Sequence, residues 1–299
     1  MNKRFNFLLI TACWLLPVIL ACFFVANCGK EEPILEKPEQ KAPKAVSVKL
    51  LTYNVLADQQ QFGKVRNSKL LEILENSNAD IIALQEVAPE FAEQLYLQEW
   101  VGKYHWHKKD GKPFVAREFI ILSKYPILSY VSEKLLSIQH RNLFIITVEI
   151  EGVKTSIGTC HLESRLEDGP LRAEQLDQFF KHLNETEESF FLGDFNFGDG
   201  EQPETGRLNS EYQDPWLMLR PNEPGYTWDR EKSDMALKGS FPKEKSRRID
   251  RVLFKSKRWI PKSIKILGDK PVSDQQPHIF PSDHFGLEAV FEFKQLEIK

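Results

Sequence analysis

The stretch F-F-L-G-D-F-N-F, at residues 190–197, carries the strongest structural and chemical pattern in this sequence. Its apolar start followed by Gly193 is typical of a buried strand that runs into a loop. Side chains two apart at the end of a strand point the same way, so Asp194 and Asn196 are expected to face one cleft. A carboxylate can accept a proton from water, and an amide can donate to a developing oxyanion. The alternative is an Asx turn that merely closes the strand.

Apolar and amphipathic runs on both sides of this stretch predict the remaining elements. Strands are expected at 46–53, 80–84, 119–122, 144–150, 155–160, 249–254 and 286–293. Helices are expected at 69–76 after a capping Ser68, at 89–98 and at 170–183. Strands and helices alternate at first and strands dominate later. This order favours a mixed α/β domain with two sheets packed together.

Composition predicts an ordinary globular domain with one large core. The chain has 299 residues, of which 41% are hydrophobic and 28% charged. Its net charge of −3 provides no global positive field, so a nucleic-acid surface would have to be local. The basic run from Lys238 to Arg258 is the candidate, with a solvated loop and strand edge as the alternative. Cys160 lies in a predicted strand and is expected to be a buried small hydrophobe.

The beginning of the chain predicts export and a membrane attachment. Two basic residues precede an apolar run over residues 7–26, as in a secretory leader. Residues 25–28, V-A-N-C, resemble a bacterial lipoprotein box, which makes 1–28 a leader. An uncleaved N-terminal anchor is the alternative, because the run approaches the length of a membrane span. Residues 29–45, rich in Glu, Lys and Pro, predict a flexible tether, so that 46–299 would be an extracytoplasmic, membrane-anchored domain.

Polar residues of chemical interest follow the predicted strands. They are Asn54, Glu86, His161, Asp194 with Asn196, and Asp283 with His284, while Asp250 lies near the start of a further strand. Each alone has a structural explanation, since single acids and histidines at strand ends are usually solvated or satisfied. Together they suit hydrolysis at phosphorus. A hard divalent cation prefers carboxylate and amide oxygens, the attacking water needs a base, and the phosphoryl oxygens need donors.

Motifs along the chain carry a resemblance to a known superfamily. In order, they are T-Y-N (52–54), L-Q-E (84–86), H-L-E-S (161–164), L-G-D-F-N (192–196), R-I-D-R (248–251) and P-S-D-H-F-G-L (281–287). The chain resembles the endonuclease/exonuclease/phosphatase superfamily, which has the deoxyribonuclease I-like fold. Y-T-W-D (226–229) and R-N-L-F (141–144) make it most similar to the 5′-tyrosyl-DNA phosphodiesterase branch. The resemblance implies a four-layer α/β/β/α architecture, a two-sheet β-sandwich flanked by helices.

The resemblance also implies which residues bind the metal and the substrate. Glu86 would be the principal Mg²⁺ ligand, with Mn²⁺ as the alternative ion, and Asn54 would help to hold the metal site or the phosphate. Asp283 would support these ligands or bind a second metal ion. Ser164 would contact the phosphate. From its own chemistry, Trp228 would stack on a base or an aromatic leaving group, or else be a core tryptophan.

The catalytic roles that the resemblance implies fall on five residues. Asp194 would orient and deprotonate the attacking water. Asn196 and His161 would donate to the phosphoryl oxygens. His284 would stabilise the pentacovalent transition state, with Asp250 fixing its tautomer. The branch has a leucine and an arginine after the D-x-N segment, where this chain has Phe197 and Gly198.

We therefore expect a monomeric, Mg²⁺-dependent phosphodiester hydrolase that acts on DNA or another nucleic acid, with 5′-tyrosyl-DNA phosphodiesterase-like activity. One alternative is a lipid or sugar-phosphate phosphodiesterase, which a weak dependence of activity on salt would favour. The other is a non-catalytic surface binding protein on a nuclease fold. An Asp194→Asn substitution separates an enzyme from a binding protein, because only turnover needs that carboxylate.

Overall fold

The computed structural model describes residues 46–106, 108–109, 112–113 and 118–294. The predicted leader (1–28) and tether (29–45) lie outside the described residues, and these predictions stay as they are. Within the described part of the chain, no helix has both the length and the apolar composition needed to cross a membrane.

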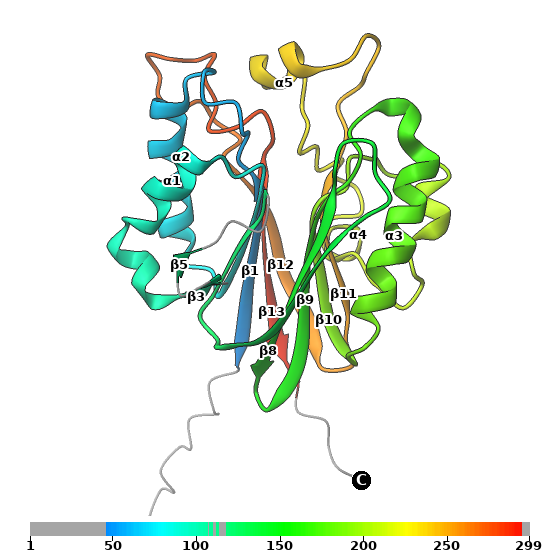
Figure 1. Ribbon diagram of the computed structural model, residues 1–299. Helices are drawn as coiled ribbons and strands as arrows, with labels where there is room; N and C mark the ends of the chain where they lie inside the picture. Colours follow the sequence, from blue (N-terminus) through cyan, green and yellow to red (C-terminus); the bar gives the residue numbers. More distant parts are fainter. Residues whose placement is uncertain (1–45, 107, 110–111, 114–117, 295–299) are drawn as a thin grey trace, which may run out of the picture. The chain divides into compact units, whose positions relative to one another are not determined.

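Two sheets form the centre of the domain (Figure 1). In spatial order, the six-stranded sheet consists of β12 (Trp259–Leu267), β13 (Gly286–Phe293), β1 (Ser47–Asn54), β2 (Ile81–Gln85), β6 (Ile120–Ser123) and β3 (His105–Trp106). The five-stranded sheet consists of β11 (Asp250–Lys255), β10 (Glu188–Asp194), β9 (Val153–His161), β8 (Asn142–Ile150) and β7 (Ile127–Lys134). A short ribbon pairs β4 (Lys108–Lys109) with β5 (Lys112–Pro113).

Helices cover the outer faces of both sheets (Figure 1). The α-helices are α1 (Gly63–Ser77), α2 (Pro89–Tyr96), α3 (Gly169–Leu183), α4 (Pro215–Leu219) and α5 (Asp234–Gly239). Short 3₁₀ helices are η1 (Glu99–Lys103), η2 (Leu166–Asp168) and η3 (Glu204–Arg207). The helices α1 and α2 pack on the six-stranded sheet, and α3 packs on the five-stranded sheet. The predicted four-layer α/β/β/α architecture is confirmed.

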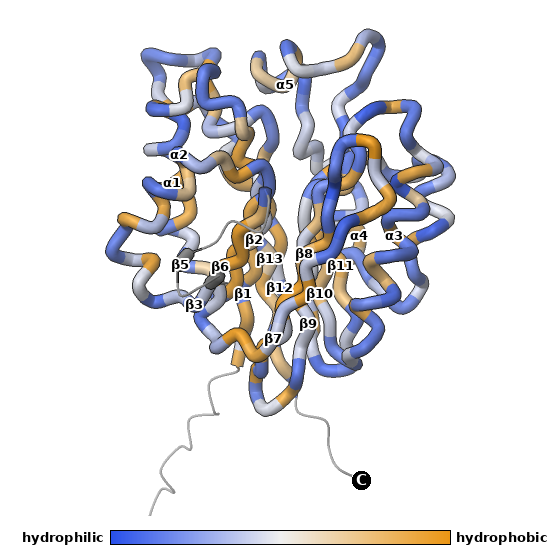
Figure 2. The backbone as a smooth tube through the Cα atoms, in the orientation of Figure 1, coloured by the Kyte–Doolittle hydropathy of each residue, from blue (hydrophilic) through white to orange (hydrophobic). Residues whose placement is uncertain are grey.

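Alternation along the strands divides the apolar side chains between these layers. In β10, Phe190 and Leu192 point between the sheets, whereas Phe191 points toward α3. Phe291 of β13 meets Phe190 from the opposite sheet, with ring centroids 4.9 Å apart. Figure 2 shows the apolar positions gathered on the strands of the two sheets. Two-sided burial explains why β10 is an unbroken apolar run in the sequence.

Gly193 permits the close approach of β9 and β10. Its φ is +144°, and a Cβ atom there would lie 2.3 Å from the carbonyl oxygen of Cys160 on β9. The two strands run parallel, with Gly193 opposite Cys160 and Asp194 opposite His161. Cys160 is buried, as predicted. The glycine therefore allows two strands to end side by side with an acid and a histidine.

Polar bonds cross between the sheets near this end of the sandwich. The side chain of Gln85, on β2, donates to Thr159 Oγ1 of β9 at 2.8 Å and to Thr52 Oγ1 at 3.1 Å. Gln85, Thr52 and Thr159 are fully buried. A buried amide must keep its hydrogen bonds, because leaving a donor unsatisfied costs about 1–3 kcal/mol. The bond from Gln85 to Thr159 joins the two sheets, and the bond to Thr52, within the six-stranded sheet, holds the Gln85 side chain in place for it.

The structure corrects the predicted start of the first helix. Ser68 does not cap it, because α1 begins at Gly63 and Ser68 donates to the backbone of its own helix. The reason is Arg66, which is fully buried together with Asn67 although Val65 and Ser68 on either side of this pair are exposed. Its guanidinium donates to the carbonyl oxygens of Val55 at 3.1 Å and Pro281 at 3.2 Å. These bonds hold the first turn of α1, which precedes the predicted start at residue 69, against the rest of the domain.

Candidate active site

The six-stranded sheet supplies one half of the candidate site. The parallel strands β1 and β2 end together, with Asn54 opposite Gln85 and Glu86 directly after it. Because β13 is antiparallel to β1, the segment before it, with Asp283 and His284, reaches the same end. The backbone of Glu86 has a φ of +53°, a left-handed conformation that costs about 1–3 kcal/mol for such a residue. Residues held in this way are found at functional sites.

The five-stranded sheet supplies the other half. The parallel strands β9 and β10 end at His161 and Asp194. The antiparallel strand β11 starts where β10 ends, so Asp250 lies opposite Asp194. Asn196 follows at a φ of +55°, and its backbone N–H donates to Asp194 Oδ1 at 2.9 Å. This bond forms the Asx turn that was given as the alternative for this motif. The turn closes the strand and also places Asp194 and Asn196 at the candidate site, so the two interpretations do not exclude each other.

Asn54 joins the two halves through its side chain. Its Nδ2 donates to Glu86 Oε1 and to Asp194 Oδ2, each at 3.0 Å, and its Oδ1 accepts from the Leu56 backbone at 3.1 Å. The amide therefore holds two carboxylates beside each other. Burial raises the pKa of Glu86, but His161 and the Asn54 hydrogen bond lower it by more, to about 2. Glu86 is thus an ionised carboxylate at neutral pH.

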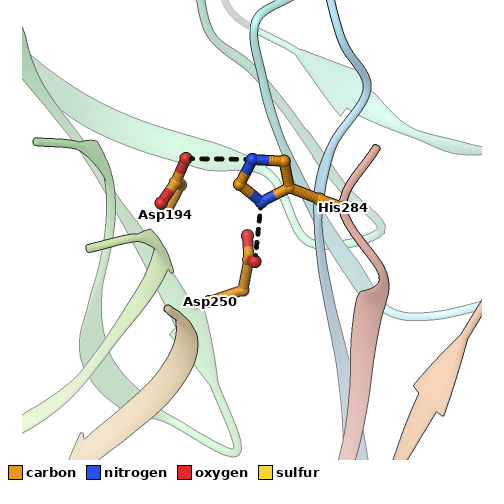
Figure 3. Close-up of side chains that lie close together, drawn as sticks. All are labelled: Asp194, Asp250 and His284. Carbon is orange, nitrogen blue, oxygen red and sulfur yellow. Dashed lines mark hydrogen bonds and ion pairs between the residues drawn. The ribbon is translucent and has the colours of Figure 1, made fainter. Parts of the chain in front are cut away.

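Asp194, Asp250 and His284 form a buried acid–imidazole–acid arrangement (Figure 3). The Nδ1 of His284 lies 2.9 Å from Asp250 Oδ2, and its Nε2 lies 3.7 Å from Asp194 Oδ2. Burial lowers the pKa of His284, but Asp250 and Asp194 raise it well above the ordinary value. Burial also raises the pKa of Asp250, against the opposing effect of His284. The ring is therefore an imidazolium at neutral pH, held by two acids.

His161 faces the same carboxylates from the other side. Its Nε2 lies 3.5 Å from Asp194 Oδ2 and 3.6 Å from Glu86 Oε1. Its Nδ1 lies 2.9 Å from Glu118 Oε2, and Arg141 Nη1 contacts the same nitrogen at 2.8 Å. Burial and Arg141 lower the pKa of His161, but Glu118 and Asp194 raise it by more. Glu118 and Arg141 are functional-site residues that the sequence interpretation did not single out.

A cleft with about 160 Å³ of space opens between these side chains. Its lining includes Ser164, Trp228 and Asp283, so the structure brings every predicted site residue to this end of the domain. The Trp228 ring packs edge-on against His284, with centroids 4.9 Å apart, and only 8% of the residue is exposed. Burial raises the pKa of Asp283, against the opposing effect of His284. Trp228 is therefore at once a packed residue and a wall of the cleft.

Thr227, beside Trp228, is a third residue that the sequence interpretation did not single out. Its fully buried hydroxyl oxygen accepts from the backbone N–H groups of Ile249 at 3.1 Å and Asp250 at 2.9 Å. Its carbonyl oxygen accepts from Phe285 N at 2.8 Å. Thr227 thereby joins the segments that carry the Asp250–His284 pair. The Y-T-W-D motif contains Thr227, so the sequence could have marked it, but the sequence interpretation assigned a role only to the tryptophan of this motif.

The basic run does not form one surface. Arg247, Arg248 and Arg251 are buried and paired with acids of the domain. Arg258 and its neighbours lie beyond β11, near Glu188 at the opposite end of β10. The buried arginines therefore fit neither interpretation, and the alternative of a solvated loop holds for the exposed lysines of the run. The exposed lysines before Arg247 remain near the cleft, because Phe241 and Glu244 line it.

The donor set fits a hard divalent cation. Among the described residues, side-chain atoms of Asp194, Asp250 and His284 lie within 4.8 Å of one another, and the two carboxylates are the ligands of this group that a hard cation would take. Glu86 and Asp283 add carboxylates to the same cleft. Because carboxylate oxygens dominate this donor set, the cleft suits a hard cation such as Mg²⁺ or Mn²⁺. The predicted ligands and the acid–imidazole group are neighbours in one site.

The chain belongs to the Endonuclease/Exonuclease/phosphatase family, whose family model matches residues 51–284. Among curated proteins it is similar to tyrosyl-DNA phosphodiesterase 2 of Homo sapiens, 29% identical over 222 residues, 70% of this chain and 58% of that protein. The Gallus gallus protein of the same name is 27% identical over 260 residues, 82% of this chain and 67% of that protein. The chain thus spans less than two thirds of the human relative.

Solved structures share the fold. The structure of Danio rerio TDP2 complexed with single strand DNA product has a TM-score of 0.68 and 24% identity, over 82% of this chain and 98% of that one. Beta toxin from Staphylococcus aureus has a TM-score of 0.61 and 18% identity, over 81% of this chain and 99% of that one. The superfamily and fold predicted from the ordered motifs are therefore confirmed.

Proposed function

We propose that this protein is a Mg²⁺-dependent phosphodiester hydrolase that acts on DNA or another nucleic acid. The main support is the convergence of donors on Asp194 Oδ2, where Asn54 Nδ2 lies at 3.0 Å and the Nε2 atoms of His161 and His284 lie at 3.5 and 3.7 Å. A carboxylate so surrounded, in an acid-rich cleft, suits the attack of water on phosphorus. The similarity to tyrosyl-DNA phosphodiesterases supports a nucleic-acid substrate.

Two carboxylates would hold the metal ion in this proposal. Glu86 would be the main ligand, and Asp283, which lines the same cleft, would support it. When bound, the ion would supply positive charge to polarise the phosphoryl group. Asn54 is the residue that keeps Glu86 next to Asp194, because its single amide group donates to both.

The chemistry then follows from this chain's own side chains. Asp194 orients a water molecule and takes its proton, and the water oxygen forms a bond to phosphorus as the bond to the leaving oxygen breaks. His161 and Asn196 donate to the phosphoryl oxygens. His284, an imidazolium held by Asp250, neutralises the charge that develops in the pentacovalent transition state. Desolvation in the cleft strengthens each of these interactions.

The finer proposal is a 5′-tyrosyl-DNA phosphodiesterase-like preference. Ser164 would contact the phosphate, and Trp228 would stack on a base or an aromatic leaving group, because both line the cleft. Phe197 and Gly198 stand where that branch has a leucine and an arginine, so no arginine at that position would contact the phosphate. From the sequence of residues 1–28 we also propose an extracytoplasmic, membrane-anchored location. We further propose that the protein is a monomer. Protease sensitivity of the domain on intact cells tests that location.

The decisive experiment compares substrates with and without the metal site. The full-length protein is assayed with Mg²⁺ on a 5′-phosphotyrosyl oligonucleotide, plain single-stranded DNA and sphingomyelin, before and after chelation. Glu86→Gln should abolish turnover, while Glu90→Gln, an exposed glutamate on α2, should not. Release of tyrosine supports the finer proposal, and cleavage of plain DNA alone supports only a nuclease. Turnover of lipid alone would contradict the nucleic-acid substrate, and silence on all three would contradict hydrolysis.

A further inference from the structure

The loop after β10, residues 195–201, is bound to β11 by buried arginines. Arg251 donates from Nη1 to Asp199 Oδ1 at 2.6 Å and from Nη2 to the carbonyl oxygen of Phe197 at 3.1 Å. Its guanidinium also lies over the Phe197 ring, 5.0 Å from the centroid. One side chain of β11 therefore holds both the backbone and the side chains of this loop.

Arg248 makes a second set of bonds to the same acid. Its Nε and Nη2 donate to the two oxygens of Asp199, at 3.0 and 2.5 Å. Its Nη1 pairs with Asp214 Oδ2 at 2.8 Å. The arginine side chains are only 1% and 2% exposed, so two like charges are buried beside each other. Such a pair is stable only with acids in good geometry. Both arginines face Asp199 and Asp214, but Arg251 donates to Asp199 at 2.6 Å and lies 3.6 Å from Asp214 Oδ2, so Asp199 is the acid to which both donate closely.

These bonds lie directly beside the site. Asp250 falls between Arg248 and Arg251 in the sequence, and Asn196 precedes Phe197. Asn196 is held at a φ of +55°, a conformation that persists only where its surroundings impose it. The backbones also touch, since Phe195 N donates to Ile249 O at 2.9 Å. The arginines therefore clamp the segment with Asn196 onto the segment with Asp250.

We propose that Asp199, acting through Arg248 and Arg251, is a positioning residue that sets Asn196 and Asp194 in register with Asp250. Asp199, Arg248 and Arg251 are not among the residues that line the cleft, whereas Asp194 and Asn196 are. The positive side chains of the R-R-I-D-R segment thus serve the geometry of the site. The effect on turnover rests on the proposed hydrolytic function, whereas the effect on the loop does not.

The test is Asp199→Asn in the full-length protein, read in two ways. Hydrogen exchange in a peptide over residues 195–201 should be at least tenfold faster than in the wild type, with exchange in α1 unchanged. On the substrate that the wild type cleaves, kcat should fall at least tenfold, with KM within twofold. Asp199→Glu, which keeps the charge, should recover part of kcat. Asp177→Asn, an exposed acid on α3 that pairs with Arg207, is the matched control and should change neither reading.

Further variants keep the result interpretable. If Asp199→Asn does not fold, Arg251→Lys keeps the charge and removes the bond to Phe197 O, and the same two readings are expected. Leu74→Ala, in the remote core under α1, gives a comparison with reduced stability but an intact clamp. Unchanged exchange in a folded Asp199 variant, or a loss of kcat no larger than that of Leu74→Ala, would overturn the proposal. If the wild type hydrolyses nothing, the proposed function fails and the exchange reading alone decides the positioning role.

Discussion

Replacing Asp250 by asparagine should separate the charge of the acid–imidazole pair from its shape. Asp250 is fully buried, and its Oδ2 lies 2.9 Å from His284 Nδ1. Asparagine fills almost the same volume and keeps an oxygen that can accept from Nδ1. The backbone N–H of residue 250 can still donate to Thr227 Oγ1. The substitution therefore removes one negative charge and leaves the packing in place.

The size of the effect follows from the lost charge-assisted bond. A hydrogen bond to a charged group contributes about 1.5–3 kcal/mol. At about 1.4 kcal/mol for each factor of ten in rate, kcat should fall about 10- to 150-fold. Because Asp250 contributes most among the groups that raise the pKa of His284, while burial lowers it, that pKa should fall in the variant. The imidazolium should therefore be lost at a lower pH than in the wild type.

Two assays check this prediction. Steady-state kinetics with Mg²⁺ at neutral pH give kcat, and NMR titration of the metal-free protein gives the pKa of His284. Asp80→Asn is the matched control, because Asp80 is a partly buried acid that precedes β2, at the end of the strand opposite to the site. A variant whose kcat stays within threefold of the wild type, or whose His284 titrates as before, would refute the proposed role of the pair.

Two further predictions concern other parts of the domain. Glu118→Gln should lower the pKa of His161, because Glu118 is one of the acids that raise this pKa, while burial and Arg141 lower it. An unchanged NMR titration of His161 would contradict this prediction. Gly268→Ala should lower the free energy of unfolding by about 1–3 kcal/mol, since its Cβ would lie 1.9 Å from Tyr53 Oη at a φ of +71°. Urea titrations measure this loss. Gly152→Ala is the control, because Gly152 has a similar φ but open space around it, so its loss of stability reports only the backbone strain. Equal losses in the two variants would refute the clash with Tyr53.

Elements with a local apolar pattern could be predicted from the sequence, and others could not. The strand at Phe190 and its neighbours was found because burial on both faces makes an unbroken apolar run. β7 was missed because most of its side chains are exposed at the edge of its sheet. β12 was missed because Pro261 interrupts it, at an irregularity in its pairing with β13. Edge strands lack the two-sided burial that marks a strand in the sequence.

The same limit applies to the candidate site. Residues that follow buried strands, such as Asp194, were found because the strand pattern marks where they lie. Glu118 was not, since its partner His161 is 43 positions away and nothing near Glu118 marks it. The arginines of the R-I-D-R motif were visible, but a basic run shows only charge. Whether a guanidinium is buried on an acid or exposed to a substrate depends on contacts between distant segments.

Asn54 and Gln85 belong to one sheet, and their partners Asp194 and Thr159 belong to the other. Apolar contacts tolerate a small slide of one layer over the next, but hydrogen bonds are directional and do not. The spacing of Glu86 and Asp194 is therefore coupled to the alignment of the whole sandwich. A substitution deep between the sheets, far from any reacting atom, would therefore change the rate of the reaction by slightly changing the spacing between the two halves of the cleft.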